Sequence, residues 1–271
     1  MKIALFGIHK LLTDSLIVLE KAGLFPEVVI FPPIESPFHN LAVEICTRRQ
    51  MRFIRPESVK NTVFIEELRS YSPDRIIVVG YHQIFPKSLL ELAPMGVINF
   101  HGGLLPEEKG PIPWKWAVYE NRAFTGYTVH QMTDKVDEGK VFIKEKIELD
   151  KDESSESLFN KVAEAMANAL PVFFEEKEME DYLNNDADEA AGYRGQVSPE
   201  LCRFDLEQTG KELQRRVRAF SPRPGVYLEN NGQRILVKKM EILPEAKPEG
   251  AWIFKSADQY VKLTDYEIIK Q

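Results

Sequence analysis

Hydrophobic and polar positions follow two different periods in the first two thirds of the chain. Short apolar runs at residues 2–6, 27–31 and 75–79 are typical of strands buried on both faces of a parallel sheet. Between such runs, apolar side chains recur at helical spacing, as in residues 11–22, which Gly23 then terminates. Strands that alternate with helices predict an α/β fold with a Rossmann-like, doubly wound and mostly parallel sheet. The same patterns predict helices at residues 40–50, 62–71, 114–121 and 154–180, and strands at 53–54, 126–132 and 141–149.

The C-terminal part of the chain has a different pattern. Residues 184–192 are small, acidic and polar, which is typical of a linker, and we place a domain boundary near residue 190. We expect residues 1–190 to form one domain and residues 191–271 a small β-rich domain, built as a barrel or meander. Its predicted elements are a helix at residues 205–218 and strands at 226–228, 234–240, 251–255 and 260–264.

The clearest candidate chemistry lies in residues 97–106, where a strand runs into a glycine-rich loop. Asn99 and His101 are two residues apart, so their side chains project from the same face of a strand. An amide and an imidazole together suit chemistry on a carbonyl carbon, because both can donate a hydrogen bond to a developing oxyanion. Gly102 and Gly103 would let a substrate approach the backbone closely.

Composition and charge exclude several classes of protein. The formal net charge of −7 weighs against nucleic-acid binding, because a phosphate backbone demands a basic surface. No apolar run is long enough for a transmembrane helix and no cleavable leader follows Met1, so we expect a cytoplasmic protein. Cys46 and Cys202 match no metal or redox spacing, and we expect no metal site. Only Gly7 stands where a dinucleotide fingerprint needs three glycines, so we expect neither NAD nor FAD.

These residues resemble a known family, the 10-formyltetrahydrofolate-dependent formyltransferases. That family carries an Asn-x-His strand end, a Leu-Leu-Pro loop, and an Asp about three dozen residues later in a D-x-G turn. The matching positions here are Asn99 and His101, the loop Leu104-Leu105-Pro106, and Asp137 followed by Glu138-Gly139. The resemblance implies the formyltransferase fold.

A second segment carries the same resemblance. Residues 217–225 are similar to the segment that joins the catalytic domain to the small barrel in methionyl-tRNA formyltransferases and their sugar-nucleotide relatives. The resemblance therefore implies a small C-terminal β-barrel-like domain as well. It is strongest over residues 75–149, moderate at 205–225 and weak elsewhere.

The resemblance implies an N-formyltransferase that moves a formyl group from 10-formyltetrahydrofolate to an amine. Asn99 and His101 would stabilise the oxyanion, with roughly 3 kcal/mol per donor. Asp137 would pair with His101 or accept the proton that the amine loses. The folate is expected to contact Tyr81, His82, Gln83, Ile84 and Phe85 in one loop, and Asp134 and Val136 in the turn of Asp137. The acceptor is expected to contact Gly102, Gly103, Leu104 and Arg218.

Two acceptors are compatible with the resemblance. Methionyl-tRNA formyltransferases carry a basic insertion after the second strand, whereas residues 31–38 here contain no basic residue. Because the chain is also acidic, we expect an amino sugar linked to a nucleotide and keep methionyl-tRNA as the alternative. A folate- or nucleotide-binding module without turnover is a third possibility, and the intact Asn99, His101 and Asp137 set speaks against it.

One basic cluster stands out in the C-terminal part, and three of its members fall on one helical face. It is either a solvated face paired with Glu207 and Glu212, or a contact for a substrate diphosphate or for tRNA. Exposed strand edges in the small barrel would also permit a homodimer. The cluster consists of Lys211, Arg215, Arg216, Arg218 and Arg223.

Overall fold

The computed structural model describes residues 1–174, 193–243 and 252–269, which form two compact units. Among the described residues, the first unit contains Met1–Pro111, Gly126–Ile147, residues 160–174 and Tyr193. The second contains Ile112–Thr125, Glu148–Phe159 and the described residues from 194 onward. The boundary that we expected near residue 190 lies outside the described residues. The units differ from the expected division in one respect, because two segments between residues 112 and 159 group with the C-terminal part.

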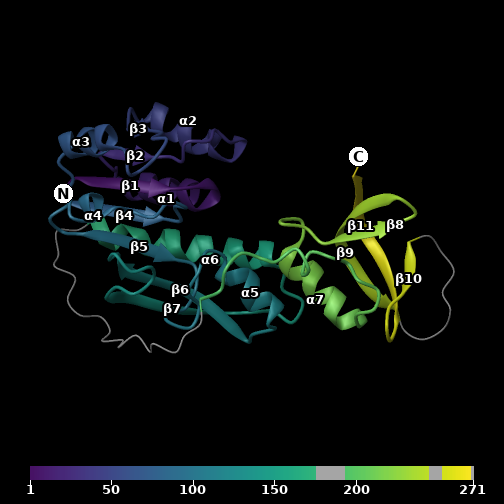
Figure 1. Ribbon diagram of the computed structural model, residues 1–271. Helices are drawn as coiled ribbons and strands as arrows, with labels where there is room; N and C mark the ends of the chain where they lie inside the picture. Colours follow the sequence, from purple (N-terminus) through teal and green to yellow (C-terminus); the bar gives the residue numbers. More distant parts are fainter. Residues whose placement is uncertain (175–192, 244–251, 270–271) are drawn as a thin grey trace. The chain divides into compact units, whose positions relative to one another are not determined.

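The described part of the first unit is built on a seven-stranded sheet in the order β3-β2-β1-β4-β5-β6-β7 (Figure 1). The pairs β3-β2, β2-β1, β1-β4 and β4-β5 are parallel, and β6 pairs antiparallel with β5. This order confirms the Rossmann-like, mostly parallel sheet. The strands are β1 (Ile3–Gly7), β2 (Val28–Ile30), β3 (Arg52–Ile54), β4 (Arg75–Val79), β5 (Val97–His101), β6 (Phe124–Gln131) and β7 (Val141–Glu148).

Helices cover both faces of this sheet. On one face, Phe6 and Val97 share a buried cluster with Phe64 of α3 and Leu89 of α4. On the other face, α1 contacts α2 and the 3-10 helix η2, whose Phe173 ring lies 5.2 Å from the Phe100 ring. The elements are α1 (His9–Ala22), η1 (Pro37–His39), α2 (Asn40–Arg48), α3 (Thr62–Ser70), α4 (Lys87–Leu90), α6 (Ser155–Ala169) and η2 (Leu170–Phe174).

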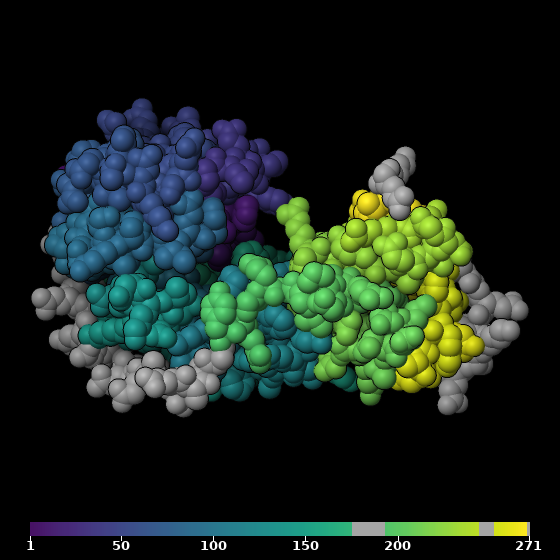
Figure 2. Space-filling view, in the orientation of Figure 1, coloured from purple at the N-terminus to yellow at the C-terminus, as the bar shows by residue number. Residues whose placement is uncertain are grey.

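The central strands are buried because they are covered on both sides. All five residues of β1 and all five of β4 are buried, as their continuous apolar runs predict. In the space-filling view, only a small part of the dark purple N-terminal segment is visible among the bluer segments (Figure 2). Gly23 adopts a left-handed φ of 70° and ends α1 as expected.

Two of the helices beside this sheet differ from the expectation. The short α4 was not predicted, since four residues carry no helical period. The long helix expected over residues 154–180 is α-helical only as far as Ala169, and the chain continues as η2. Pro171 lies in this segment and lacks the backbone N–H that an α-helix needs. The rest of the expected helix lies outside the described residues.

The second unit contains α5 (Pro113–Tyr119) and α7 (Gly210–Phe220), which pack together. Thr209 caps α7 by accepting a hydrogen bond from the Glu212 backbone N–H at 3.2 Å, so the helix begins five residues later than expected. A curled antiparallel sheet in the order β10-β11-β9-β8 completes this unit and confirms the small β-rich domain. Its strands are β8 (Tyr227–Asn230), β9 (Gln233–Leu243), β10 (Ile253–Lys255) and β11 (Tyr260–Ile269).

Across the described ranges, no helix combines the length and the apolar character that a membrane crossing requires.

His39 is a buried polar side chain next to the parallel sheet. It is 1 % exposed, and neither ring nitrogen has a hydrogen-bond partner among the described residues. Its ring stacks on His9 with centroids 5.0 Å apart. Burial lowers the pKa of His39 from 6.5 to about 4, and the nearby His9 and Arg55 act in the same direction.

We predict that replacing His39 with Leu reduces the loss of stability in acid. A pKa that is lower in the folded than in the unfolded chain gives a contribution that is complete above pH 6.5. That contribution is lost as the pH falls toward 4, at up to about 1.4 kcal/mol per pH unit. Urea unfolding of the wild type and of His39→Leu between pH 7.5 and pH 4 measures the difference.

The exposed His82→Leu variant is the matched control and should keep the wild-type pH dependence. His130 is also buried with a lowered pKa, so His39→Leu should retain part of the slope. Parallel curves for the wild type and His39→Leu over the whole range would contradict the prediction.

Candidate active site

Two neighbouring strands place the candidate residues on one face of the sheet. In the antiparallel pair of β5 and β6, Asn99 lies opposite His130 and His101 lies opposite Thr128. Directly opposite residues project to the same side, so these four side chains form a single group. Asn99 and His101 share this face, as their spacing predicts. His101, Thr128 and His130 are buried.

The loop after β5 is fixed by hydrogen bonds. The His101 Nε2 lies 2.7 Å from the backbone oxygen of Glu108, and a Glu108 carboxylate oxygen accepts the Leu104 backbone N–H at 2.7 Å. The Thr128 hydroxyl donates to the Gly103 oxygen at 2.8 Å and accepts from the Leu105 N–H at 3.0 Å. The His101 ring is therefore held by the loop that follows it.

The turn between β6 and β7 brings Asp137 to the same face. The Gln131 N–H donates to the Lys140 oxygen at 2.8 Å, which closes the turn. Gly139 permits this closure, because a Cβ there would lie 1.6 Å from the Gln131 oxygen. Asp137 itself has a left-handed φ of 57°, which Asp tolerates better than most residues.

The Asp137 carboxylate lies between the two histidines. One oxygen is 3.7 Å from the His101 Nδ1 and 3.7 Å from the His130 Nε2. The other oxygen accepts the Gly110 backbone N–H at 3.1 Å, and the side chain is only 9 % exposed. The structure thus brings together the three residues predicted to be catalytic.

His130 belongs to this group, although sequence reasoning gave it no catalytic role. Its Nε2 lies 3.0 Å from the Asn99 Nδ2, and its Nδ1 lies 2.9 Å from the Gln131 backbone oxygen. Burial lowers the pKa of His130 to about 4, and the neighbouring His101 lowers it further while Asp137 opposes the shift. The alternation of side chains along β6, combined with the register of β6 against β5, could have placed His130 opposite Asn99.

Glu108, Thr128 and Lys109 were also missed. Lys109 is buried and its ammonium lies 3.0 Å from a Glu138 carboxylate oxygen. This bond lowers the pKa of Glu138. Because Glu138 follows Asp137, and Lys109 precedes Gly110, the ion pair and the Gly110–Asp137 bond together join the two loops.

Several side chains of the first predicted folate loop, residues 81–85, contact other segments of the fold. The Tyr81 hydroxyl donates to the Phe31 oxygen at 3.1 Å, and burial raises the pKa of Tyr81 to about 12. Gln83 accepts the Val59 backbone N–H at 2.8 Å, and Phe85 is buried in the core. These three side chains attach the loop to the rest of the fold, while His82 and Ile84 are exposed.

The second predicted folate segment is largely exposed. Asp134 and Val136 both face solvent, and Val136 is 54 % exposed. Ile84, at 66 %, gives the first loop a similar exposed apolar side chain. Exposed apolar side chains in both segments suit contact with the face of a flat heteroaromatic ring, so the residues present fit a pterin.

The predicted acceptor contacts are divided between the two units. Gly102, Gly103 and Leu104 follow His101, with the Gly103 oxygen and the Leu104 N–H already bonded to side chains. Arg218 lies on α7, in the second unit. Its guanidinium donates to the backbone oxygens of Lys151 at 2.8 Å and Glu153 at 3.3 Å.

Other arginines of the basic cluster are also bonded. Arg216 donates to Glu212 at 2.9 Å and to two backbone oxygens, and Arg215 pairs with the same carboxylate. Glu212 is one of the two carboxylates expected as partners if the basic cluster is a solvated, ion-paired helix face. Within the described residues, no group of three or more His, Cys, Asp or Glu side chains is arranged to hold a metal ion.

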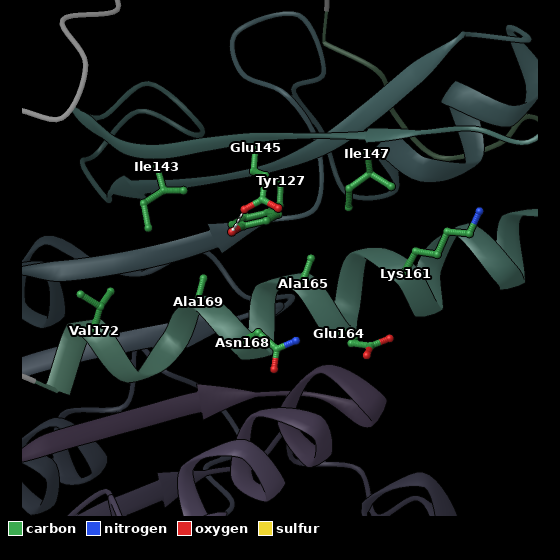
Figure 3. Close-up of a pocket in the computed structure, with 10 residues that line it drawn as sticks. All are labelled: Tyr127, Ile143, Glu145, Ile147, Lys161, Glu164, Ala165, Asn168, Ala169 and Val172. Carbon is green, nitrogen blue, oxygen red and sulfur yellow. Dashed lines mark hydrogen bonds between the residues drawn. The ribbon is translucent and has the colours of Figure 1, made fainter. Parts of the chain in front are cut away.

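A separate pocket lies on the opposite face of β6, between β7 and α6 (Figure 3). There the Tyr127 hydroxyl donates to Glu145 at 2.7 Å, and burial raises the pKa of Tyr127. Because side chains alternate along a strand, Tyr127 points away from the face of Thr128 and His130. The pocket is lined by Tyr127, Ile143, Glu145, Ile147, Lys161, Glu164, Ala165, Asn168, Ala169 and Val172.

Two family models match this chain and identify its class. The formyl transferase model matches residues 35–173, and the model of the formyl transferase C-terminal domain matches residues 196–264. The chain therefore belongs to the formyl transferase family. This family uses 10-formyltetrahydrofolate, so the expected formyl donor is confirmed at the level of the family.

Curated relatives are methionyl-tRNA formyltransferases. The protein of that name from Caldanaerobacter subterraneus subsp. tengcongensis is 27% identical, over 96% of this chain and 87% of its own length. The one from Anaeromyxobacter dehalogenans strain 2CP-1 is 31% identical, over 91% of this chain and 80% of its own length.

Solved structures share the fold. HypX from Aquifex aeolicus superposes with a TM-score of 0.71 at 19% identity, and this chain spans 45% of its length. HypX has also been solved with tetrahydrofolic acid. An N-formyltransferase from Helicobacter canadensis, in complex with folinic acid and dTDP-3-aminofucose, gives a TM-score of 0.68 at 15% identity. That alignment covers 96% of this chain and 98% of the Helicobacter chain.

We predict that Gly139→Ala destabilises the first unit, because the new Cβ would collide with the Gln131 oxygen. Clashes of this kind typically cost about 1–3 kcal/mol. Gly210→Ala is the control, because its Cβ would meet no atom closer than 3.4 Å. Urea unfolding should show a clear loss for Gly139→Ala and a change within about 0.5 kcal/mol for Gly210→Ala. Equal stabilities for the two variants would rule out the close approach at Gly139.

Proposed function

We propose that this protein transfers a formyl group from 10-formyltetrahydrofolate to a primary amine, with Asn99, His101 and Asp137 as the catalytic residues. The observation that carries the proposal is the position of the Asp137 carboxylate, 3.7 Å from the His101 Nδ1 on the face that Asn99 shares. Membership of the formyl transferase family supports the same reaction.

The reaction needs a hydrogen-bond donor that stabilises a developing negative charge, and a path for one proton. The donor molecule supplies a formyl carbon, which the amine nitrogen attacks. A new carbon–nitrogen bond forms, the bond from the formyl carbon to the folate nitrogen breaks, and one proton passes from the amine to that nitrogen. Charge develops on the formyl oxygen meanwhile, so a fixed N–H group nearby lowers the barrier.

Asn99 is the best-placed donor for the formyl oxygen. One hydrogen of its amide nitrogen is directed at the His130 Nε2, 3.0 Å away, which leaves the second hydrogen for the oxygen. His101 is less suited to this part, because its Nε2 lies 2.7 Å from the Glu108 backbone oxygen. A carbonyl oxygen can only accept, so this nitrogen carries its proton toward the loop.

His101 and Asp137 are placed to handle the proton. With hydrogen on Nε2, the neutral His101 ring has its lone pair on Nδ1, which faces Asp137 at 3.7 Å. That nitrogen can take the proton of the attacking amine, and the carboxylate stabilises the imidazolium that results. His101 thus acts as the base in this proposal, and Asp137 supports its charged form.

Replacing Asn99 or His101 with Ala should lower kcat steeply and leave the fold intact. Loss of one oxyanion donor costs about 10²–10³ in kcat, and loss of a general base costs about 10²–10⁴. Tetrahydrofolate formation, followed at saturating donor and acceptor, measures the effect. Unfolding curves like that of the wild type serve as the control, and near-normal turnover at either position would remove the role given to it.

Two acceptors are supported by different observations. The curated relatives are methionyl-tRNA formyltransferases, which favours the amino group of methionyl-tRNA. The net charge of −7, the absence of basic residues from 31–38 and the paired arginines of α7 favour a small amino-sugar nucleotide. We place methionyl-tRNA first because of the relatives and keep the sugar expected from the sequence as the second candidate.

The acceptor can be decided in one assay. The protein is incubated with 10-formyltetrahydrofolate and either methionyl-tRNA or a panel of amino-sugar nucleotides, and both tetrahydrofolate and the formylated product are measured. We expect formyl-methionyl-tRNA as the product. Formylation of a sugar alone would establish the second candidate. Formate release without any acceptor would identify a hydrolase and overturn the transferase proposal.

The salt dependence of KM tests whether the acceptor is a nucleic acid. Binding to a nucleic acid releases counterions, so its affinity falls steeply as salt rises. If methionyl-tRNA is the acceptor, KM for it should increase at least about tenfold between 50 and 200 mM salt. Arg216→Gln should raise KM for tRNA only if its bond to Glu212 opens on binding. A KM that does not depend on salt would argue against tRNA.

A further inference from the structure

His130 lies directly opposite Asn99 in the β5–β6 pair. One of its ring nitrogens faces a hydrogen-bond acceptor, and the other faces a side-chain amide. Its Nδ1 is 2.9 Å from the Gln131 backbone oxygen, and its Nε2 is 3.0 Å from the Asn99 side-chain amide. The ring is 2 % exposed, so water does not compete freely for either nitrogen. Both contacts therefore constrain where the ring carries its hydrogen.

The contact with Gln131 fixes the tautomer of His130. A backbone carbonyl oxygen only accepts hydrogen bonds, so Nδ1 must carry a hydrogen. Burial, assisted by the neighbouring His101, lowers the pKa of His130 to about 4, which keeps the ring neutral near pH 7. A neutral ring with hydrogen on Nδ1 has a lone pair on Nε2, and that nitrogen can only accept.

The orientation of Asn99 follows from this tautomer. A side-chain amide has a donor end and an acceptor end that occupy nearly the same volume, and a half turn about its last torsion exchanges them. Opposite a lone pair, only the NH₂ end makes a hydrogen bond. The carbonyl end would place two lone pairs 3.0 Å apart in a buried setting, which is unfavourable.

We propose that His130 is a positioning residue, which acts through its Nδ1-protonated ring to hold the NH₂ end of Asn99 toward the reacting oxygen. The inference rests on the proposed formyl transfer for its catalytic meaning. Its structural part, the tautomer and the amide orientation, stands on the two hydrogen bonds and on the neutral state of the buried ring. The strand register supplies the alignment, because Asn99 and His130 are directly opposite in β5 and β6.

Two surrounding groups are relevant to the charge of His130. The Asp137 carboxylate, 3.7 Å from Nε2, would favour a second proton on the ring. His101 packs edge-on against His130 with centroids 6.5 Å apart, and a positive charge on His101 would oppose that proton. Burial is the largest influence and keeps the ring neutral, so its Nε2 lone pair is available to the amide hydrogen of Asn99.

The first test reads the tautomer without any ligand. In protein labelled with ¹⁵N-histidine, long-range ¹H–¹⁵N spectra at pH 7 should show His130 as a neutral ring with hydrogen on Nδ1. Assignment comes from the spectrum of His130→Gln. A hydrogen on Nε2, or a doubly protonated ring, would overturn the proposal.

A second variant reverses the partner of Nε2. Asn99→Asp replaces a donor by a carboxylate, so the His130 ring should take up a second proton and its titration should move to higher pH. Asn99→Leu removes the donor without adding charge and should leave the ring neutral. An unchanged spectrum in Asn99→Asp would show that the two side chains do not interact.

Kinetics then test whether the orientation matters. Gln at position 130 keeps a polar side chain but can present either its oxygen or its nitrogen, so it no longer selects one end of Asn99. We expect His130→Gln to lower kcat about 10- to 100-fold and to change KM for 10-formyltetrahydrofolate less than about threefold, because misplacing one catalytic group typically costs up to about 10². In the Asn99→Ala background the same change should have less than about a twofold effect.

The outcomes separate this inference from the proposed function. Equal losses of kcat in both backgrounds would show that His130 acts independently of Asn99, which overturns the inference. If the wild type formylates no acceptor, the proposed function fails, and the NMR result still decides the tautomer and the amide orientation. His130→Phe is a second variant for the cycle if His130→Gln proves unstable.

Discussion

β6 runs antiparallel to β5, and this pairing is the constraint on which the candidate site depends. It places Asn99 opposite His130 and His101 opposite Thr128, so that two polar pairs lie side by side on one face of the sheet. A shift of one residue in either strand would turn half of these side chains to the other face. The turn after β6 then crosses back, because Gly139 allows the chain to pass against the Gln131 oxygen, and Asp137 reaches both histidines.

The polar groups of the site are buried, and they are tolerated there because they satisfy one another. Glu108 accepts hydrogen bonds from the His101 ring through its backbone oxygen and from the Leu104 N–H through its carboxylate. Thr128 bonds to two further loop residues, and Gly110 donates to Asp137. Each bond also fixes a position. The result is a site whose groups are oriented before substrate binds, which is how hydrogen-bond donors become effective in catalysis.

Much of this arrangement could be predicted from the sequence. The apolar runs predicted the central strands, the two-residue spacing placed Asn99 and His101 on one face, and the family resemblance singled out Asp137. His130 could not be recognised in the same way, because its role depends on which residue of β5 lies opposite it, and periodicity within a single strand does not give register. Glu108 and Lys109 were missed for a similar reason, since their partners are backbone groups and turn residues brought together by folding.

The C-terminal elements show the same limit. The start of α7 depends on Thr209 as a cap, and the helical pattern alone extended it too early. The acceptor contact predicted for Arg218 stays a prediction, and the structure adds that its guanidinium is bonded to two backbone oxygens. Charge patterns identify a basic helix, whereas the use of each charge depends on carboxylates and carbonyl groups that other segments contribute.

In the proposed reaction, the Asn99 amide and the His101–Asp137 pair surround the formyl group of a bound folate. A crystal structure with a stable analogue of 10-formyltetrahydrofolate that keeps the formyl group on N10 tests this most directly. We expect the pterin against the loop at residues 81–85 and the turn at 131–137, with the formyl group beside Asn99 and its oxygen about 3 Å from the amide nitrogen. A folate bound on the other face of β6, between β7 and α6, or one whose formyl group lies away from Asn99 and His101, would contradict it.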